Sequence, residues 1–197
     1  IQEYGQATSV TGICGVDIDA IRGWQRSLGS PEVWLAVFDS GIELANPEFD
    51  GRLAPSPAWI SLSCPQPGSP APSTCCCNGG NCNYGDPDDV HGHGTWVAAT
   101  AMANHDGQGV MGVDPGCTLL PVRISAMDDG KHARVIIALE TIDDANGANE
   151  TYEKVKVINM SLQLIETTAE TEQSAALLAL LESLREEGVT TVVISGN

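Results

Sequence analysis

Basic residues are scarce in this chain of 197 amino acids. It contains 9 Lys and Arg residues against 26 Asp and Glu residues, which gives a formal net charge of −17. A surface with this much negative charge repels the phosphates of nucleic acids and anionic lipid headgroups. We therefore expect no nucleic acid and no membrane among its partners, whereas cationic ligands, including metal ions, are attracted.

Long apolar runs and a leader segment are also missing. No stretch is apolar for long enough to span a bilayer. The first residues, Ile1 to Tyr4, lack the basic and apolar regions of a secretory signal peptide. We expect the chain to start as a processed product or inside a longer precursor, and its length suits one sizeable domain or most of one.

Cysteine is concentrated in one stretch. Between Gly51 and Val90 no periodic pattern persists, and Pro, Gly and Ser fill the gaps between five of the seven cysteines. These five are Cys64, Cys75, Cys76, Cys77 and Cys82. The composition predicts a disulfide-stapled surface insertion of a secreted, extracellular protein. A zinc knuckle is the alternative, but the spacing fits no common zinc pattern. Because seven is odd, at least one cysteine is free or pairs outside the chain.

Four apolar segments are predicted to be buried strands, and helical patterns separate them. The strands cover residues 33–38, 118–124, 155–160 and 189–194, with a bulge expected at Pro121. The helices cover residues 16–27, 93–104, 133–145 and 169–187, the last ending at Gly188. The predicted buried faces are Val135, Ile136, Leu139 and Ile142 on the third helix and Ala175, Leu178, Leu181 and Leu184 on the fourth. This order predicts an open, mostly parallel α/β sheet with helices on both faces.

Polar residues follow the predicted strands and meet at one edge of the sheet. Asp39 ends the first strand, Ser161 follows the third, and Asn197 follows the fourth. His93 begins a helix that can pack at the same edge. Ligands of open parallel sheets bind at the carboxyl ends of the strands, so this edge is the predicted functional site.

Asp39, His93 and Asn197 have complementary chemistry. A carboxylate at a rigid strand end accepts Nδ1–H of an imidazole and fixes its tautomer, and that imidazole can then transfer protons near neutral pH. A side-chain amide can stabilise a developing oxyanion. Taken singly, each residue has an ordinary structural role: a cap or turn for Asp39, a hydrogen-bonded core residue for His93, and a turn for Asn197.

Five short motifs carry a resemblance to a known family. They are Val-Phe-Asp-Ser-Gly-Ile at 37–42, His-Gly-Thr at 93–95, Gly-Val-Met-Gly-Val at 109–113, Val-Ile-Asn-Met-Ser-Leu at 157–162 and Ser-Gly-Asn at 195–197. With these motifs the chain resembles the subtilisin-like serine proteases, or subtilases, over residues 33–197. The whole chain, 1–197, then represents the N-terminal portion of a single peptidase domain, with the cysteine-rich insertion at about residues 51–90.

The resemblance implies a role for each matching residue. It makes Asp39 the triad carboxylate, His93 the general base and Asn197 the oxyanion donor of an endopeptidase that acts on polypeptides. It also implies a substrate-binding strand and an opposite pocket wall. The strand residues are Ser161, Leu162 and Gln163, and the wall residues are Ile194, Ser195 and Gly196. The family likeness further suggests a zymogen with an inhibitory propeptide.

The chain departs from the family pattern at several points. No Gly-Thr-Ser-Met-Ala-like stretch is present, so we expect the nucleophilic serine on a segment following Asn197 or on a companion chain. The chain would then stop after a central strand, through nicking or truncation, and be inactive alone. Gln163 stands where glycine is usual, Trp96 where His or Arg is common, and the insertion is longer than in simple members.

The loop of residues 104–110, Asn-His-Asp-Gly-Gln-Gly-Val, suggests a structural calcium site. A tight, glycine-bearing loop can turn several carbonyls inward, as Ca²⁺ requires. By resemblance the ligands are the carbonyls of Asn104, Gln108 and Val110, the side chains of Asp106 and Glu48, and an N-terminal oxygen such as Gln6. The alternative is a metal-free turn that Asp106 caps.

Two other functions are compatible with parts of the sequence. A pseudoprotease would bind peptides without cleaving them, but intact Asp39, His93 and Asn197 argue against it. A flavodoxin-like binding protein requires a glycine-rich phosphate loop, for which residues 39–42 are poor candidates. For the protease, Asp88, Asp89, Asp128 and Asp129 either favour basic substrate residues or form a solvated acidic surface.

Overall fold

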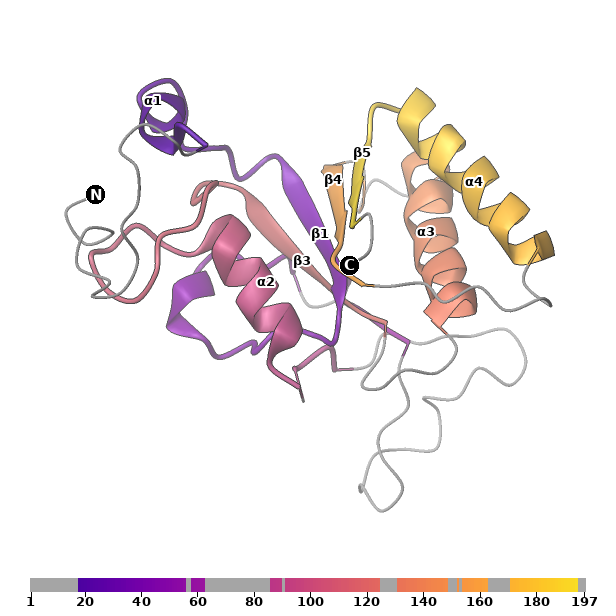
Figure 1. Cartoon of the computed structure of the whole chain (residues 1–197), viewed down its shortest axis with the longest axis horizontal. Coiled ribbons are helices and arrows are strands. Elements are labelled where there is room, and N and C mark those ends of the chain that lie inside the picture. The colour runs from indigo at the N-terminus through magenta and orange to yellow at the C-terminus, as the bar shows by residue number, and fades with distance from the viewer. Residues whose placement is uncertain are drawn as a thin grey trace, which may run out of the picture.

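A computed structural model gives the fold of the chain. It describes residues 18–55, 58–62, 86–89, 91–124, 131–148, 152, 154–162 and 171–194. A parallel sheet forms its centre (Figure 1). The strands are β1 (Trp34–Asp39), β2 (Ile60–Ser61), β3 (Thr118–Arg123), β4 (Val155–Met160) and β5 (Thr190–Val193), in the spatial order β2-β3-β1-β4-β5. Every pairing is parallel, so the carboxyl ends of the strands share one edge, and the predicted sheet is confirmed.

Helices cover both faces of this sheet (Figure 1). The helices are α1 (Ala20–Trp24), the 3₁₀ helix η2 (Pro47–Phe49), α2 (His93–Met102), α3 (Lys131–Ala148) and α4 (Thr171–Glu186). α3 and α4 pack together on one face, and α2 packs on the other. The alternation of side chains along β1 explains the arrangement. Phe38 joins the core under α3 and α4, whereas Val37 packs with Ala98 and Met102 of α2.

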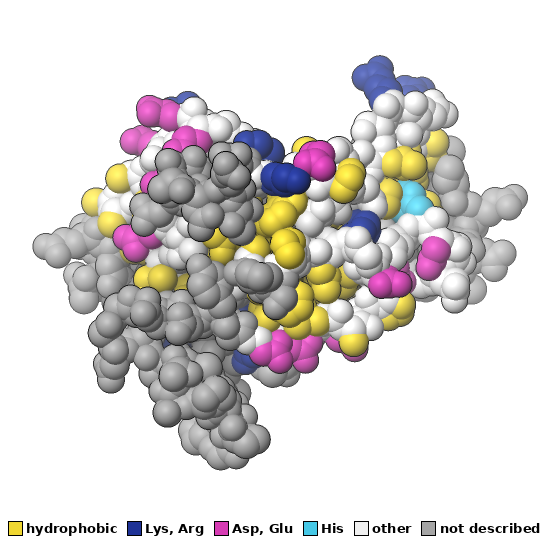
Figure 2. Space-filling model, turned by 180° about the vertical axis from the view of Figure 1, so that it is seen from behind, with side chains coloured by type: hydrophobic (Ala, Val, Ile, Leu, Met, Phe, Trp, Pro, Cys, Tyr) yellow, Lys and Arg dark blue, Asp and Glu magenta, His cyan; other side chains and the backbone are white. Residues whose placement is uncertain are grey.

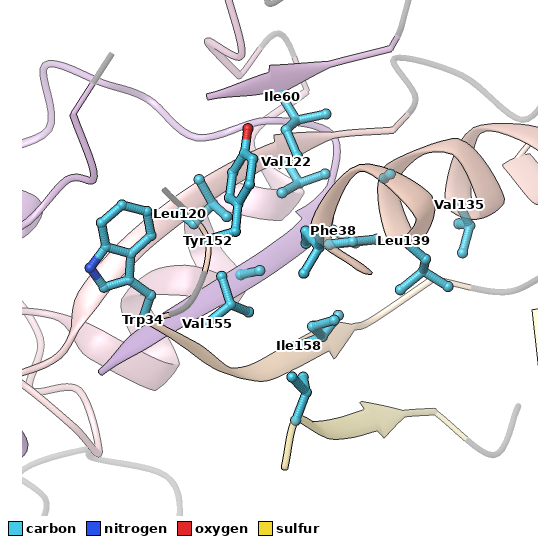
Figure 3. Packing of buried hydrophobic residues seen from close by; sticks show 14 of the residues in the cluster. Trp34, Phe38, Ile60, Leu120, Val122, Val135, Leu139, Tyr152, Val155 and Ile158 are labelled. Carbon is cyan, nitrogen blue, oxygen red and sulfur yellow. The ribbon is translucent and has the colours of Figure 1, made fainter. Parts of the chain in front are cut away.

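The larger of the two cores lies between the sheet and α3 (Figure 3). Phe38 of β1, Val122 of β3, Ile158 of β4 and Leu139 of α3 meet there, and each has no exposed surface. Fully burying an apolar side chain of this size stabilises the fold by about 1.5–3 kcal/mol. Tyr152 is also buried, and its hydroxyl donates to the carbonyl of Ala58 at 3.0 Å. The sheet is thereby a rigid base for residues at its carboxyl edge.

Pro121 lies in a regular part of β3, so the predicted bulge is wrong. The register between β1 and β3 runs without interruption from Trp34↔Thr118 to Asp39↔Arg123. Backbone groups of Leu119 and Arg123 bond toward the β2 side of β3, and the two-residue period directs the Pro121 nitrogen the same way. It falls between those bonds, so its missing N–H removes none from the β1 pairing.

The buried faces of α3 and α4 differ partly from the prediction. On α4, Leu178 is 62% exposed and Ala175 is exposed, while the residues that contact the core are Leu177, Leu180, Leu181 and Leu184. That set follows the i, i+3, i+4, i+7 spacing with four leucines, so it buries more apolar surface than the predicted stripe. On α3, Ile136 is only half-buried, and Ala138 is buried beside Val135, Leu139 and Ile142.

The ends of the predicted elements also moved. α1 spans five residues of the predicted helix 16–27, and Trp24 anchors it by donating from Nε1 to the carbonyl of Val113 at 2.7 Å. β2 lies inside the stretch predicted to be without strands, because a two-residue strand is too short to show a periodic pattern. Gly188 ends α4 as predicted, with φ at +87° and its N–H bonded to Arg185.

Cys117 is a free, buried cysteine, in agreement with the odd cysteine count. Burial raises the pKa of its thiol to about 11, and the hydrogen bond to Asp114 acts in the same direction. The Cys117 sulfur lies 2.7 Å from Asp114 Oδ2. Cys14 and the five clustered cysteines lie outside the described residues, so the predicted disulfides stay a prediction.

Some apolar surface stays exposed. Among the described strands β5 lies at an edge of the sheet, and Val192 and Val193 are each about half exposed. Seen from behind, hydrophobic side chains gather in the middle of the molecule, with both acidic and basic side chains at their margin (Figure 2). Within the described ranges, none of the helices combines the length and the apolarity that crossing a bilayer would take.

Candidate active site

The carboxylate of Asp39 lies next to the imidazole of His93. Asp39 is the last residue of β1, and His93 is the first residue of α2. The distance from His93 Nδ1 to Asp39 Oδ1 is 2.7 Å, and the side chains are 41% and 5% exposed, respectively. The N–H of Ser40 donates to the same oxygen at 2.7 Å. Since Nδ1 faces Asp39, Nε2 is the ring nitrogen left to exchange a proton with a reacting group.

The carboxylate of Asp39 accepts few hydrogen bonds. Its second oxygen, Oδ2, is buried and has no hydrogen-bond partner among the described residues. Leaving a buried carboxylate oxygen unpaired costs free energy. The hydrogen bonds to Oδ1 therefore matter more for the stability of this buried carboxylate. The buried carboxylate of Asp39 therefore holds the His93 ring through Oδ1, which lies 2.7 Å from Nδ1.

Two glycines allow close backbone approaches around this contact, Gly94 between α2 and the end of β1 and Gly41 beside the segment that precedes α2. A Cβ atom on Gly94 would lie 2.2 Å from the Gly41 carbonyl oxygen and 2.9 Å from Asp39 Cβ. A Cβ atom on Gly41, whose φ is +114°, would lie 2.4 Å from the carbonyl oxygen of Pro87. A side chain on Gly94 would push α2 away from the end of β1, whereas one on Gly41 would displace the backbone at Pro87 and Asp88. The short distance between Asp39 and His93 thus requires glycine at position 94.

A second carboxylate, that of Asp89, receives five hydrogen bonds beside this pair. Its Oδ1 accepts from the N–H groups of His91 and Gly92 and from the hydroxyl of Ser40, each at 2.9 Å. Its Oδ2 accepts from the N–H of Thr95 at 2.9 Å and from the Thr95 hydroxyl at 2.6 Å. Burial alone would raise the pKa of Asp89, but the hydrogen bonds from Thr95, Gly92 and His91 outweigh it and lower that pKa to about 2.

The two acidic residues before His93 differ in their surroundings. From the sequence, Asp88 and Asp89 are both expected either to favour basic substrate residues or to face solvent. In the structure, Asp89 turns to the start of α2, whereas Asp88 is exposed and its Oδ1 accepts from the N–H of Leu44 at 3.0 Å. Asp128 and Asp129 lie outside the described residues. The two side chains therefore have different surroundings, and the preference for basic substrate residues stays a prediction.

The structure describes some of the predicted substrate-binding residues, and these lie at the same edge of the sheet. Ser161 and Leu162 follow β4 and Ile194 follows β5, so they lie at the carboxyl edge that also holds Asp39. Ser161 Oγ accepts from the Asn159 side chain at 3.0 Å, Leu162 packs partly on the core, and Ile194 is 43% exposed. The other predicted residues, Gln163, Ser195, Gly196 and Asn197, lie outside the described residues.

Glu48 reaches the loop that is predicted to bind calcium. The N–H of Val110 donates to Glu48 Oε1 at 3.3 Å. Glu48 Oε2 is buried and lacks a hydrogen-bond partner in the part of the chain that the structure describes. A buried carboxylate oxygen without a partner is the kind of group that a hard cation satisfies, so Glu48 fits the predicted site.

The remaining predicted ligands are compatible with an ion that depends on carbonyls. Hydrogen bonds within the described ranges leave the carbonyl oxygens of Asn104, Gln108 and Val110 unused. The Asn104 side chain is engaged elsewhere, since its Oδ1 accepts from Arg52 Nε at 2.8 Å. Asp106 Oδ1 accepts from the N–H of Gln108 at 2.9 Å, which is the cap foreseen for a metal-free turn. Nowhere in the described ranges do three His, Cys, Asp or Glu side chains gather to hold a metal, and Gln6 lies outside those ranges.

Sequence reasoning missed Ser40 and the structural role of Asp89. The signal was present, because Asp89 stands three residues before Gly92 at a helix start. An Asp that accepts from N–H groups two and three residues later forms a local turn of the kind that precedes helices. The bond from Asp89 to Ser40 joins residues 49 positions apart, and no local pattern predicts it.

The chain belongs to the subtilase family, because residues 30–197 match the family model described as "Subtilase family". One relative is the Major intracellular serine protease of Bacillus subtilis (strain 168), 27% identical over 154 residues, which are 74% of this chain and 38% of that protein. Another is the Minor extracellular protease Epr of the same organism, 27% identical over 180 residues, 91% of this chain and 22% of that protein. The chain spans less than half the length of both relatives.

Solved structures agree on the fold. The nisin leader peptidase NisP from Lactococcus lactis matches with a TM-score of 0.62 at 21% identity, over 87% of this chain and 46% of that one. The prenylagaramide maturation protease PagA matches with a TM-score of 0.58 at 22% identity, over 92% of this chain and 52% of that one. Both likenesses show that the described sheet and helices have the subtilisin-like α/β fold.

Proposed function

We propose that the complete protein is a secreted serine endopeptidase that hydrolyses peptide bonds by acyl transfer. The observation that carries this proposal is the 2.7 Å contact between His93 Nδ1 and the buried Asp39 at the carboxyl edge of the sheet. A general base needs a fixed tautomer, an exposed second nitrogen and a group that stabilises its protonated form. Two observations on His93 support that role: its Nδ1 faces Asp39, and its side chain is 41% exposed.

The proposed reaction gives each residue one task. His93 Nε2 takes the proton of a serine hydroxyl as the serine oxygen attacks the peptide carbonyl, and it returns that proton to the leaving amine. Asp39 holds the tautomer and stabilises the imidazolium. Asn197 and a backbone N–H bind the oxyanion, and loss of one such donor typically lowers kcat by about 10²–10³-fold.

The nucleophile is proposed to lie outside these 197 residues. Support comes from the absence of a Gly-Thr-Ser-Met-Ala-like stretch and from the short span of the chain against its relatives. The serine would come from a segment following Asn197 or from a companion chain. Val192, Val193 and Ile194 offer apolar surface that such a segment would cover. The 197 residues alone should therefore be inactive.

The same proposal includes the substrate groove and maturation of the enzyme. Ser161, Leu162 and Gln163 form one wall for an extended polypeptide, and Ile194, Ser195 and Gly196 form the other. Secretion and disulfide bonds are supported by the cysteine-rich stretch between Gly51 and Val90. An inhibitory propeptide, cleaved from a zymogen, accords with a chain that belongs to this family.

A structural Ca²⁺ ion is proposed for the loop after α2. Glu48 and Asp106 would hold it with the carbonyls of Asn104, Gln108 and Val110, and Gln6 would complete the shell. When bound, the ion would supply positive charge that ties this loop to Glu48 and the N-terminal arm. The buried, unpartnered Oε2 of Glu48 supports its presence.

Labelling with a serine-directed fluorophosphonate tests the proposed function. The complete protein should be labelled at one serine, and His93→Ala should lower the labelling rate by at least about 10³-fold, because the general base is lost. Undiminished labelling of that variant would contradict the assignment. A wild-type protein that binds peptides but neither reacts nor cleaves would instead support the pseudoprotease.

A further inference from the structure

We propose that Asp89 is a positioning residue for His93. Its carboxylate fastens the first turn of α2 to Ser40 and thereby sets the position of the imidazole against Asp39. This inference rests on the proposed function, in which His93 is the general base. Asp89 itself does not touch the reacting atoms in this account.

The direction of each hydrogen bond shows why a carboxylate is needed. Ser40 Oγ accepts from the N–H of Gly94 at 3.0 Å, so its own proton is free to go to Asp89. The Thr95 hydroxyl accepts from the N–H of Glu43 at 2.9 Å and likewise donates to Asp89. The other three bonds come from backbone N–H groups. All five partners of Asp89 are therefore donors, and only an ionised carboxylate offers acceptors on both sides.

These bonds surround His93 in the sequence and in space. His91 and Gly92 precede it, Gly94 and Thr95 follow it, and each contributes a backbone N–H to Asp89 or to Ser40. The backbone at His93 is thus held on both sides by one anion and one hydroxyl. A helix start that is bound this way cannot rotate without breaking several of the bonds together.

The hydrogen bonds around Asp89 also connect to Asp39. Ser40 follows Asp39 directly, and its N–H donates to Asp39 Oδ1, the oxygen that contacts His93. Ser40 therefore binds Asp39 through its backbone and Asp89 through its side chain. The two carboxylates act on His93 from different directions, Asp39 through the ring and Asp89 through the backbone.

With the charged groups around it, Asp89 keeps its five hydrogen bonds over a wide pH range. Asp88 and His91 are exposed beside Asp89, and Arg123 bonds the Asp88 carbonyl at 3.1 Å. The Asp89 pKa of about 2 lies far below the ordinary range of an imidazole. Asp89 stays charged while His93 gains and loses its proton, so the helix start does not change during proton transfer.

The experiment compares Asp89→Asn with Asp86→Asn in the complete protein. Asn keeps the size of Asp but turns an NH₂ group toward at least two donors, whichever way the amide is oriented. We expect kcat to fall about 10–100-fold with little change in KM, because a misplaced general base slows the chemical step and not substrate binding. Asp86→Asn removes the same charge from the same segment, where Asp86 accepts one hydrogen bond from the N–H of Asp88, and kcat should stay within about twofold.

A second readout separates this inference from the proposed function. In protein with ¹⁵N-labelled histidine, the Nδ1–H resonance of His93 should shift or broaden in Asp89→Asn and stay in place in Asp86→Asn. If the wild type hydrolyses no peptide, the proposed function fails, and the resonance still tests the positioning role. If Asp89→Asn does not fold, Ser40→Ala, which removes one link, should shift the same resonance. An unmoved resonance in the folded variant, or equal kcat values for Asp89→Asn and Asp86→Asn, would overturn the inference.

Discussion

Gly94 and Gly41 meet where the His93 helix crosses the end of β1. A Cβ atom on Gly94 would lie 2.2 Å from the Gly41 carbonyl oxygen, well inside the contact distance of a carbon and an oxygen. The obstacle is backbone and cannot swing aside. Since His93 precedes Gly94 and Asp39 lies two residues before Gly41, this backbone contact determines how close the two side chains come.

Gly94→Ala should therefore destabilise the protein although it lies in a helix. Alanine in a helix interior normally gains about 1 kcal/mol over glycine, whereas overpacking of this kind costs about 1–3 kcal/mol or more. We expect the free energy of unfolding to fall by about 2 kcal/mol, measured by urea denaturation. Gly23→Ala in α1 is the matched control, since no atom lies within 4 Å of the added Cβ, and it should be neutral or stabilising. Equal stability of the two variants would refute the steric argument.

Acid should weaken the protein partly through Asp89. Its pKa falls from 3.8 to about 2 on folding, so the ionised form stabilises the native state at pH values above the unfolded pKa. That contribution disappears as the pH drops from about 4 to about 2, and it amounts to about 1 kcal/mol because the carboxylate is only half-buried. Asp89→Asn lacks the titration, so its stability deficit should shrink between about pH 6 and about pH 2.5 in urea unfolding. A deficit that is the same at both pH values would count against the assignment.

The sheet could be predicted because its strands are continuous apolar runs of ordinary length. β4 begins and ends at the predicted residues, and β1 and β3 differ by one residue at their ends. Elements that depend on tertiary contacts were less accessible. The rotation of α4 about its axis follows from packing against α3 and the sheet. As a result Leu177 contacts the core, whereas Leu178, which was predicted to be buried, is exposed. Edge strand β2 gains its stability from β3, and its two residues carry no pattern of their own.

At the candidate site, sequence reasoning found the residues whose chemistry is unusual for their position. Asp39 and His93 came from strand-end polarity and from the family motifs, and the structure brings them into contact. Ser40 and Asp89 were not predicted because Ser and Asp are common at turns. Their importance depends on which groups donate hydrogen bonds to them. That information requires coordinates for residues 49 positions apart in the chain.

Calcium should stabilise the folded protein, if the proposed site is correct. A ligand at a hundred times its Kd adds about 2.7 kcal/mol, so the melting midpoint should rise in calcium and fall in a chelator. Glu48→Gln keeps the shape of the side chain and removes its charge, and it should raise the calcium Kd at least about tenfold. Asp50→Asn removes an exposed charge two residues away and should leave the response intact. Identical wild-type midpoints in calcium and in chelator would rule out the site.

The central claim is that Asp39 and His93 work as one proton-transfer unit, and peptide hydrolysis by Asp39→Asn tests it most directly. Asparagine fits the same space but places an amide N–H₂ or a neutral oxygen before Nδ1, so the tautomer and the imidazolium lose their support. Measured in the complete protein near pH 7, kcat should fall by about 10⁴-fold while the melting midpoint stays close to that of Asp50→Asn. A kcat within about threefold of the wild type, in a folded variant, would contradict the account.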